Sequence, residues 1–339
     1  MTTNEGYFGN CCWWSCELDR NLIIKIAACA VGSLKKSIKS RASCHPQKKM
    51  FSLALIISAG ASVSYAWGTV GHTTVGYVAE SFLTPKGIAY VNRVLANGES
   101  LHSVATWADQ VKTTPPYQFT IPLHFVSIRD DPRNRHCGYN DNRDCPNSNC
   151  IVSAIQSYTY SAECTNSGLY HVEQYEALKF LVHFFGDIAQ PLHVENRDQG
   201  GVRDVATFAG QKTTLHDTWN LFIPNKRSGE LGSISAYAAY LVQRIKAGKF
   251  PDPNPNHWLS AHGLQDQTSH RNSLAAIDYA NDANALNCGQ EVWPFYDANP
   301  TADLSGTYYD HAKFVADFQI AKAGYRLAQW INAIANTCR

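Results

Sequence analysis

The sequence predicts a mainly α-helical single domain over residues 67–339, with long disulfide-stapled loops and at most one short β-hairpin. Apolar residues recur at three- and four-residue intervals over several long segments, which is the period of an amphipathic helix. Loops rich in Asn, Asp, Gly and Pro separate these segments. One pair of short segments suits a hairpin, namely Val202–Phe208 followed by Gln211–Thr214.

Five segments carry the helical period, and we expect the longest loops to lie between them. The predicted helices are Thr73–Leu83, Tyr170–Ile188, Ile234–Ala247, Leu274–Leu286 and Lys313–Asn336. The predicted loops are Arg129–Asn149, Asn196–Asp204 and Pro251–Asn256. Gly324 lies inside the last helix, where glycine is otherwise unfavourable, so it indicates close packing against another helix.

Residues 50–66 have the order of a secretory signal peptide. Lys48 and Lys49 precede Met50, an apolar run follows, and Ala66 ends a small-residue cleavage site. Residues 1–49 are then either an extra leader or an extension of the gene model. The apolar run is too short to span a bilayer, which needs about 20 residues, so we expect secretion without membrane attachment. Cleavage after Ala66 would free the α-amino group of Trp67.

Removal of residues 1–66 leaves an acidic domain with an even number of cysteines. That segment holds 8 of 29 Lys+Arg and 3 of 28 Asp+Glu, which leaves 21 basic and 25 acidic residues, a net charge of −4. A basic nucleic-acid-binding surface is therefore not expected, and a phosphate substrate would need bound metal for positive charge. Six of the 11 cysteines remain, so we expect disulfides; Cys145 and Cys150 suit a small loop, and about 15 pairings are possible in all.

Nitrogen and oxygen donors form a series along this domain that suits a multinuclear zinc site. His183 and Asp187 are four residues apart, so on a helix they share one face, and Pro191 turns the chain so that His193 can approach from beyond the helix end. A core histidine with a capping carboxylate is the alternative, but an unpaired Asp in so apolar a helix would be costly. The candidate ligands are Trp67, His72, Asp109, His124, His183, Asp187, His193 and His216.

Several motifs in fixed order make the domain resemble the mung bean nuclease family, the secreted, zinc-dependent, single-strand-specific nucleases of fungi and plants. The motifs are WGTVGH at Trp67, WADQVK at Trp107, HFFGDIAQPLH at His183, TTLHDTW at Thr213, DLSGTYYD at Asp303 and AKAGYRLAQW at Ala321. The resemblance covers essentially all of 67–339. It implies a helical fold of the phospholipase C and single-strand nuclease type, and disulfides Cys137–Cys288 and Cys145–Cys150.

The same resemblance implies three zinc ions. Asp109, His124, His183 and Asp187 would hold one. The amine and carbonyl of Trp67, with His72 and a bridging Asp187, would hold the second. His193 and His216 would hold the third, together with a group four residues after His216. The family has Asp at that place and this chain has Asn220, so the third zinc is expected to bind more weakly. Asp217 directly follows His216 and lies about 100° from it around a helix, so it is not expected to replace the family's Asp as the third ligand.

The implied activity is hydrolysis of single-stranded RNA and DNA to 5′-phosphate products, with 3′-nucleotides as further substrates and no obligate protein partner. Asp109 would orient the nucleophile, and Lys112 would neutralise transition-state charge unless it is a solvated surface lysine. Phe125 would stack a nucleobase. Ser127 stands where the family can have an acidic base-contacting residue, which leaves base preference open.

Two other functions compete with this one. A zinc phospholipase C has a similar ligand set, N-terminal Trp included, but the motif order and Phe125 favour the nuclease. A secreted zinc protein with impaired catalysis is suggested by Asn220. Metal content and cleavage of single-stranded substrate distinguish these possibilities.

Overall fold

The computed structural model describes residues 67–95, 98–164, 173–289 and 291–338, and the backbone of two strands nearer the N-terminus. The chain divides into two units, Met1–Ala61 and Ser62–Arg339. In the first, β1 (Trp13–Leu18) pairs antiparallel with β2 (Leu22–Ala27). The signal-peptide segment 50–66 and the rest of 1–49 lie outside the described residues.

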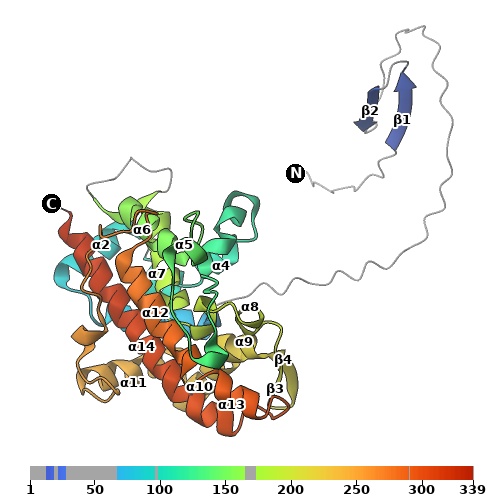
Figure 1. Cartoon of the computed structure of the whole chain (residues 1–339). Coiled ribbons are helices and arrows are strands. Elements are labelled where there is room, and N and C mark those ends of the chain that lie inside the picture. The colour runs from blue at the N-terminus through green and yellow to red at the C-terminus, as the bar shows by residue number, and fades with distance from the viewer. Residues whose placement is uncertain are drawn as a thin grey trace, which may run out of the picture. The chain divides into compact units, whose positions relative to one another are not determined.

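The second unit is built almost entirely from helices (Figure 1). Its α-helices are α1 Gly68–Glu80, α2 Pro85–Val94, α3 Leu101–Val104, α4 Trp107–Val111, α5 Asp141–Asp144, α6 Ile151–Ala162, α7 Gln174–Asp187, α8 Asp198–Gly201, α9 Leu215–Asp217, α10 Ile223–Leu231, α11 Ile234–Lys246, α12 Leu274–Cys288, α13 Trp293–Ala298 and α14 Thr307–Asn336. Its 3₁₀ helices are η1 Pro115–His124, η2 Pro132–Asn134, η3 Pro191–Val194 and η5 Pro255–Trp258, and η4 Thr218–Phe222 is a π-helix. Its hairpin joins β3 (Val205–Phe208) to β4 (Gln211–Thr214).

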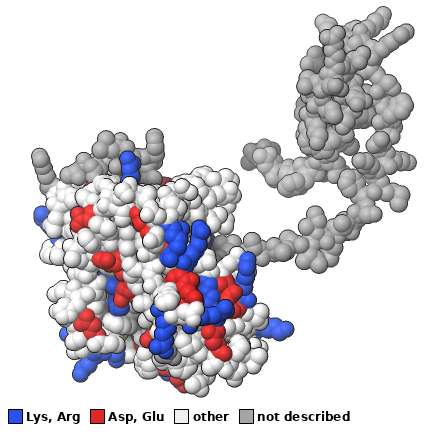
Figure 2. Space-filling model, viewed as in Figure 1, with Lys and Arg blue, Asp and Glu red and all other residues white. Residues whose placement is uncertain are grey.

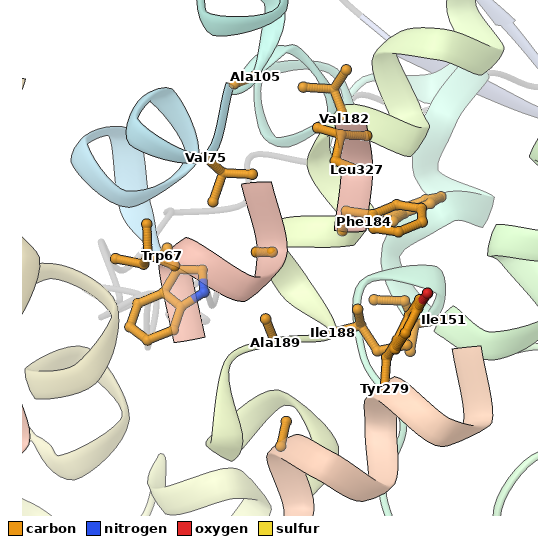
Figure 3. Close-up of a cluster of buried hydrophobic side chains, with 14 of the residues drawn as sticks. Trp67, Val75, Ala105, Ile151, Val182, Phe184, Ile188, Ala189, Tyr279 and Leu327 are labelled. Atoms are coloured by element: carbon orange, nitrogen blue, oxygen red, sulfur yellow. The ribbon is translucent and has the colours of Figure 1, made fainter. Parts of the chain in front are cut away.

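The core forms where α1, α7 and α14 pack together, with α6 and α12 against them. Trp67, Val75, Phe184 and Leu327 are among the buried side chains drawn in Figure 3. Gly324 of α14 faces α1, where an added Cβ would come within 2.5 Å of the Val78 side chain. Its expected role in close helix packing is therefore confirmed, and this contact fixes α1 against the longest helix.

The mainly helical prediction is confirmed, with differences at the ends of elements. The first helix begins at Gly68 rather than Thr73, and the last begins at Thr307 rather than Lys313. For the long central helix, the described part begins at Gln174, and the predicted start at Tyr170 lies outside the described residues. Helices such as α2, α6 and α10 were not predicted. Thr84 caps the start of α2, because its hydroxyl accepts a hydrogen bond from the Gly87 N–H. Pro85 follows as the first residue of the helix, a position that suits proline.

Three disulfides join the cysteines of this unit. Cys137–Cys288 and Cys145–Cys150 have the pairing that the resemblance implied, and Cys164–Cys338 links α6 to the end of α14. The first and third close loops of 151 and 174 residues, so they restrict the unfolded chain strongly. The expected stapling of the loops is confirmed. Among the described residues, no helix is long and apolar enough to cross a membrane.

Candidate metal centre

Separate elements bring the predicted ligands to the interior. His72 comes from α1, Asp109 from α4 and His124 from the end of η1. His183 and Asp187 lie one turn apart on α7, as their spacing predicted. His193 follows on η3, which starts at Pro191 directly after that helix. All six side chains are buried.

Five of these residues form a compact inner group around the two carboxylates. Asp187 lies 3.3 Å from His72 Nε2 through one oxygen, and 3.3 Å from His183 Nε2 and 2.9 Å from His124 Nδ1 through the other. Asp109 Oδ1 lies 3.4 Å from His183 Nε2 and 3.8 Å from His124 Nδ1. The rings of His72 and His183 stack with their centroids 3.8 Å apart. Two sets, His72–Asp109–His183 and His124–His183–Asp187, each place their donor atoms within 4.8 Å of one another.

Backbone carbonyls fix the orientation of three imidazoles. The Nδ1 atoms of His183, His193 and His216 lie 2.8, 3.0 and 2.6 Å from the carbonyls of Ala105, His124 and Gly200. A carbonyl can only accept, so each Nδ1 carries a proton, and in a neutral ring this leaves the lone pair on Nε2. This is the arrangement in which outer partners orient metal-binding histidines.

Burial and charge set the protonation of the group. Burial lowers the pKa of His72 and His124, and it lowers the pKa of His193 to about 3. Burial alone would also lower the pKa of His183, but the carboxylates of Asp187 and Asp109 raise it to about 9.

The same charge acts in the other direction on the acids. Burial opposes ionisation of Asp109 and Asp187, yet His183 outweighs it and holds both pKa values well below their usual range. Near neutral pH the group therefore consists of ionised carboxylates, neutral imidazoles and one imidazolium.

Two glycines allow this packing. An added Cβ at Gly186 would lie 2.6 Å from His72 Nδ1, so the ring occupies space that only glycine leaves on α7. Gly200 has φ +62°, and a side chain there would overlap the Leu192 carbonyl. Gly200 also supplies the carbonyl that holds His216, so its conformation helps to position that ring.

His193 and His216 form an outer pair, with ring centroids 5.2 Å apart and an interplanar angle of 23°. Asn220 is buried on the π-helix after His216. Its Oδ1 accepts a 2.5 Å hydrogen bond from Gln190 Nε2, while Gln190 Oε1 accepts from the Leu192 N–H. The amide oxygen of Asn220 is thus already engaged. The sequence reasoning missed Gln190, because Gln is not among the usual capping residues, although Pro191 after it marks the start of a helix.

Trp67 is buried at the start of α1, and its carbonyl accepts from the Gly71 N–H. An added Cβ at Gly68 would lie 3.1 Å from the Asn220 carbonyl, so this end of α1 packs on the segment that carries Asn220. Trp67 therefore lies where α1, the helix that carries His72, packs on the segment that carries Asn220.

Lys112 is buried, not a solvated surface lysine, and its Nζ donates to Asp109 Oδ1 at 2.6 Å. Phe125 is 40 % exposed. It lines a cavity of about 360 Å³ with Ser127, His193 and His216. Glu195 lines the same cavity and was not predicted. Burial raises its pKa to about 8, which sequence alone does not reveal.

The donor set fits a metal centre on a direct structural observation. Among the described residues, buried donor atoms of the group have no hydrogen-bond partner, namely Nε2 of His72, His124, His183 and His193 and Oδ1 of Asp187. Buried polar atoms are normally satisfied, so a cluster of unpartnered nitrogen and oxygen atoms facing one another could hold a metal ion. Mixed imidazole and carboxylate donors are ligands of zinc and of several other divalent metals.

Buried clusters of histidine and aspartate side chains are typical of metal-dependent hydrolases, and this helical domain contains such a cluster. The S1/P1 Nuclease family model matches residues 67–336, and the chain belongs to that family. It is 37 % identical to Nuclease S1 of Aspergillus oryzae over 280 residues, which cover 81 % of this chain and 94 % of that protein. Nuclease P1 of Penicillium citrinum is 37 % identical over 272 residues, 79 % and 97 % of the two chains.

A plant relative, Endonuclease 4 of Arabidopsis thaliana, is 29 % identical over 299 residues, covering 85 % of this chain and 95 % of that protein. The resemblance seen in the sequence motifs is therefore confirmed. Membership of this family makes the chain a nuclease, a hydrolase that acts on nucleic acids.

Proposed function

We propose that the chain is a secreted, zinc-dependent phosphodiesterase that hydrolyses single-stranded RNA and DNA to 5′-phosphate products and also acts on 3′-nucleotides. The observation that carries this proposal is the inner group, in which two carboxylates and three imidazoles converge with unpartnered donor atoms. The family match starts at Trp67, which supports 50–66 as the signal peptide and 67–339 as the active domain. The disulfides support an oxidising destination.

The ligand sets that we propose for three zinc ions are those that the family resemblance implies. Asp109, His124, His183 and Asp187 would hold the first, and Trp67, His72 and Asp187 the second. His193, His216 and Asn220 would hold the third. When bound, clustered zinc supplies an activated water near neutral pH and neutralises phosphate charge. The positive charge that the acidic domain lacks would come from these ions.

The chain's own side chains position the reactants. Asp109 is ionised and buried, so it can accept a hydrogen bond from the attacking water and orient it toward phosphorus. Lys112 donates to the same carboxylate from a buried position, so its positive charge would lie beside a phosphate bound at Asp109. Removing Lys112 would therefore lower kcat more than it raises KM.

The cavity beside His193 and His216 is proposed to hold the nucleoside next to the scissile bond. Phe125 presents an exposed aromatic face at this cavity, on which a base of any identity can stack. Ser127 stands where the family can have an acidic residue that contacts the base, so we expect only weak discrimination between bases. A base in a duplex cannot enter such a cavity without unpairing, so single strands are preferred.

Asn220 favours a second candidate, a family member with impaired catalysis. Its amide oxygen carries no charge and already accepts from Gln190, so the third metal loses its anionic ligand. In that case two metals would bind firmly and turnover would be low.

The test is cleavage of single-stranded RNA and DNA by processed protein that starts at Trp67, before and after chelation, with zinc restored. We expect 5′-phosphate products that disappear with chelator and return with zinc. Metal-independent cleavage would contradict the proposal, and release of phosphocholine from lecithin without nuclease activity would replace it with the phospholipase. Two bound zincs without turnover would support the impaired enzyme.

A further inference from the structure

We propose that a groove leading away from the outer histidine pair binds the single strand beyond the nucleotide at the scissile bond. We call it the arginine groove and define it by Arg133, Arg135, Arg197 and Arg203. The inference rests on the proposed function, because it assigns this groove the phosphates of the same polymeric substrate.

The arginine groove is continuous with the candidate metal centre. The cavity that contains His193 and His216 shares Asn196 and Gln199 with a second cavity of about 520 Å³. That second cavity shares Arg133 and Arg197 with a third, of about 310 Å³. The first cavity alone is of the size that holds a small molecule, so a nucleotide bound there leaves the other two for its polymer neighbours.

The groove brings together arginine and aspartate side chains in equal number. The domain has an acidic excess, yet four arginines come together here from η2 and the segment around α8. In Figure 2, Lys and Arg atoms gather with Asp and Glu atoms around the place of α8 in the same view. Asp130, Asp131, Asp198 and Asp297 also line the groove, so phosphate binding depends on which arginines these acids leave available.

The arginines differ in how far they are already engaged. Arg197 makes two hydrogen bonds to Asp297, at 3.0 and 2.6 Å, and lies 4.0 Å from the centre of the Trp293 ring. Its guanidinium group is therefore held in place by these contacts and is less available to a phosphate. Arg133 is exposed and lies 3.9 Å from Asp198, a weak surface pair. Arg135 and Arg203 are exposed and form no side-chain hydrogen bond or ion pair with the residues that the structure describes.

Three available guanidinium groups suit a phosphodiester backbone. Arginine binds phosphate through paired donors, and such contacts do not depend on base identity. Each contact to a single strand releases counterions and contributes about −0.7 to the slope of log affinity against log salt. A substrate that fills only the first cavity gains nothing from these contacts, whereas a long strand does.

The experiment compares the wild type with a triple variant, Arg133→Ala, Arg135→Ala and Arg203→Ala. The matched control, Lys86→Ala, Lys246→Ala and Lys249→Ala, removes three exposed lysines that line none of these cavities. For each, kcat/KM is measured on a long single strand and on a 3′-nucleotide between 50 and 200 mM salt.

We expect the ratio of polymer to 3′-nucleotide kcat/KM to fall about tenfold in the arginine variant, and its salt slope on the polymer to weaken by about 2. The lysine control should keep both values within twofold of the wild type. Equal loss on both substrates, or no change in the ratio, overturns the inference.

A wild type that cleaves no nucleic acid refutes the proposed function, and the groove is then tested by fluorescence anisotropy with a labelled oligothymidylate. Weaker binding by the arginine variant with a reduced salt slope supports the groove. Equal binding by the arginine variant and the wild type refutes it.

Discussion

Gly186→Ala tests how tightly the fold holds the metal ligands. The new Cβ would lie 2.6 Å from His72 Nδ1 and 2.8 Å from its Cε1. Ordinary contact begins near 3.4 Å, so the ring must move by roughly 0.8 Å. It cannot move freely, because the ring stacks on His183 with the ring centroids 3.8 Å apart. The tolerance of a metal–ligand distance is only about 0.2 Å.

We therefore expect Gly186→Ala to lose the metal held by His72 on dialysis and to lower kcat about 100-fold, since a shift of about 1 Å costs that much. Overpacking should cost about 1–3 kcal/mol of stability. Metal content is measured by mass spectrometry, stability by thermal unfolding and activity on a single-stranded oligonucleotide.

Gly229→Ala is the matched control, because it lies in α10 and an added Cβ there meets no atom within 4 Å. It should keep full metal content and gain up to about 1 kcal/mol from helix propensity. The reasoning is refuted if Gly186→Ala retains the metal content and kcat of the Gly229→Ala control.

Three further predictions concern the ligands themselves. Asn220→Asp keeps an oxygen that accepts from Gln190 and adds a negative charge, so the third metal should bind at least about tenfold tighter. A competitive chelator titration measures this affinity. An unchanged affinity would exclude residue 220 as a ligand. The pKa of His183 is about 9 without metal, so metal binding near neutral pH must displace its proton. Calorimetry at pH 7 should show about one proton released, and metal affinity should rise about tenfold per pH unit up to pH 9. A metal affinity that does not depend on pH would contradict the assignment of His183 as a ligand. A single residue left before Trp67 turns its amine into an amide, so one zinc should be lost and kcat should fall at least about tenfold; a fully active extended protein would remove Trp67 from the site.

Local spacing was sufficient to predict the parts of the fold and site that depend on one segment. The period of Lys313–Asn336 and the four-residue spacing of His183 and Asp187 both correspond to features of single helices. Cys145 and Cys150 are close in sequence, so their pairing needed no tertiary information. Helix starts were less well predicted, because Gly68 begins α1 through packing against the Asn220 segment rather than through a capping side chain.

Features that depend on several segments could not be derived from spacing. The close approach of His72 to α7 requires Gly186, and the two are more than 100 residues apart in sequence. The engagement of Asn220 by Gln190 depends on how η3 packs beside the π-helix. The pKa of Glu195 near 8 results from burial, which an isolated Glu does not reveal. The pairing of Cys164 with Cys338 across 174 residues needed the folded chain.

The most direct measurement is the zinc content of purified protein that begins at Trp67, determined together with its cleavage of a single-stranded oligonucleotide. The account predicts two firmly bound zincs and a third that dissociates first, with cleavage lost as zinc is removed. Protein that contains no zinc and cleaves at the same rate in excess chelator would contradict it.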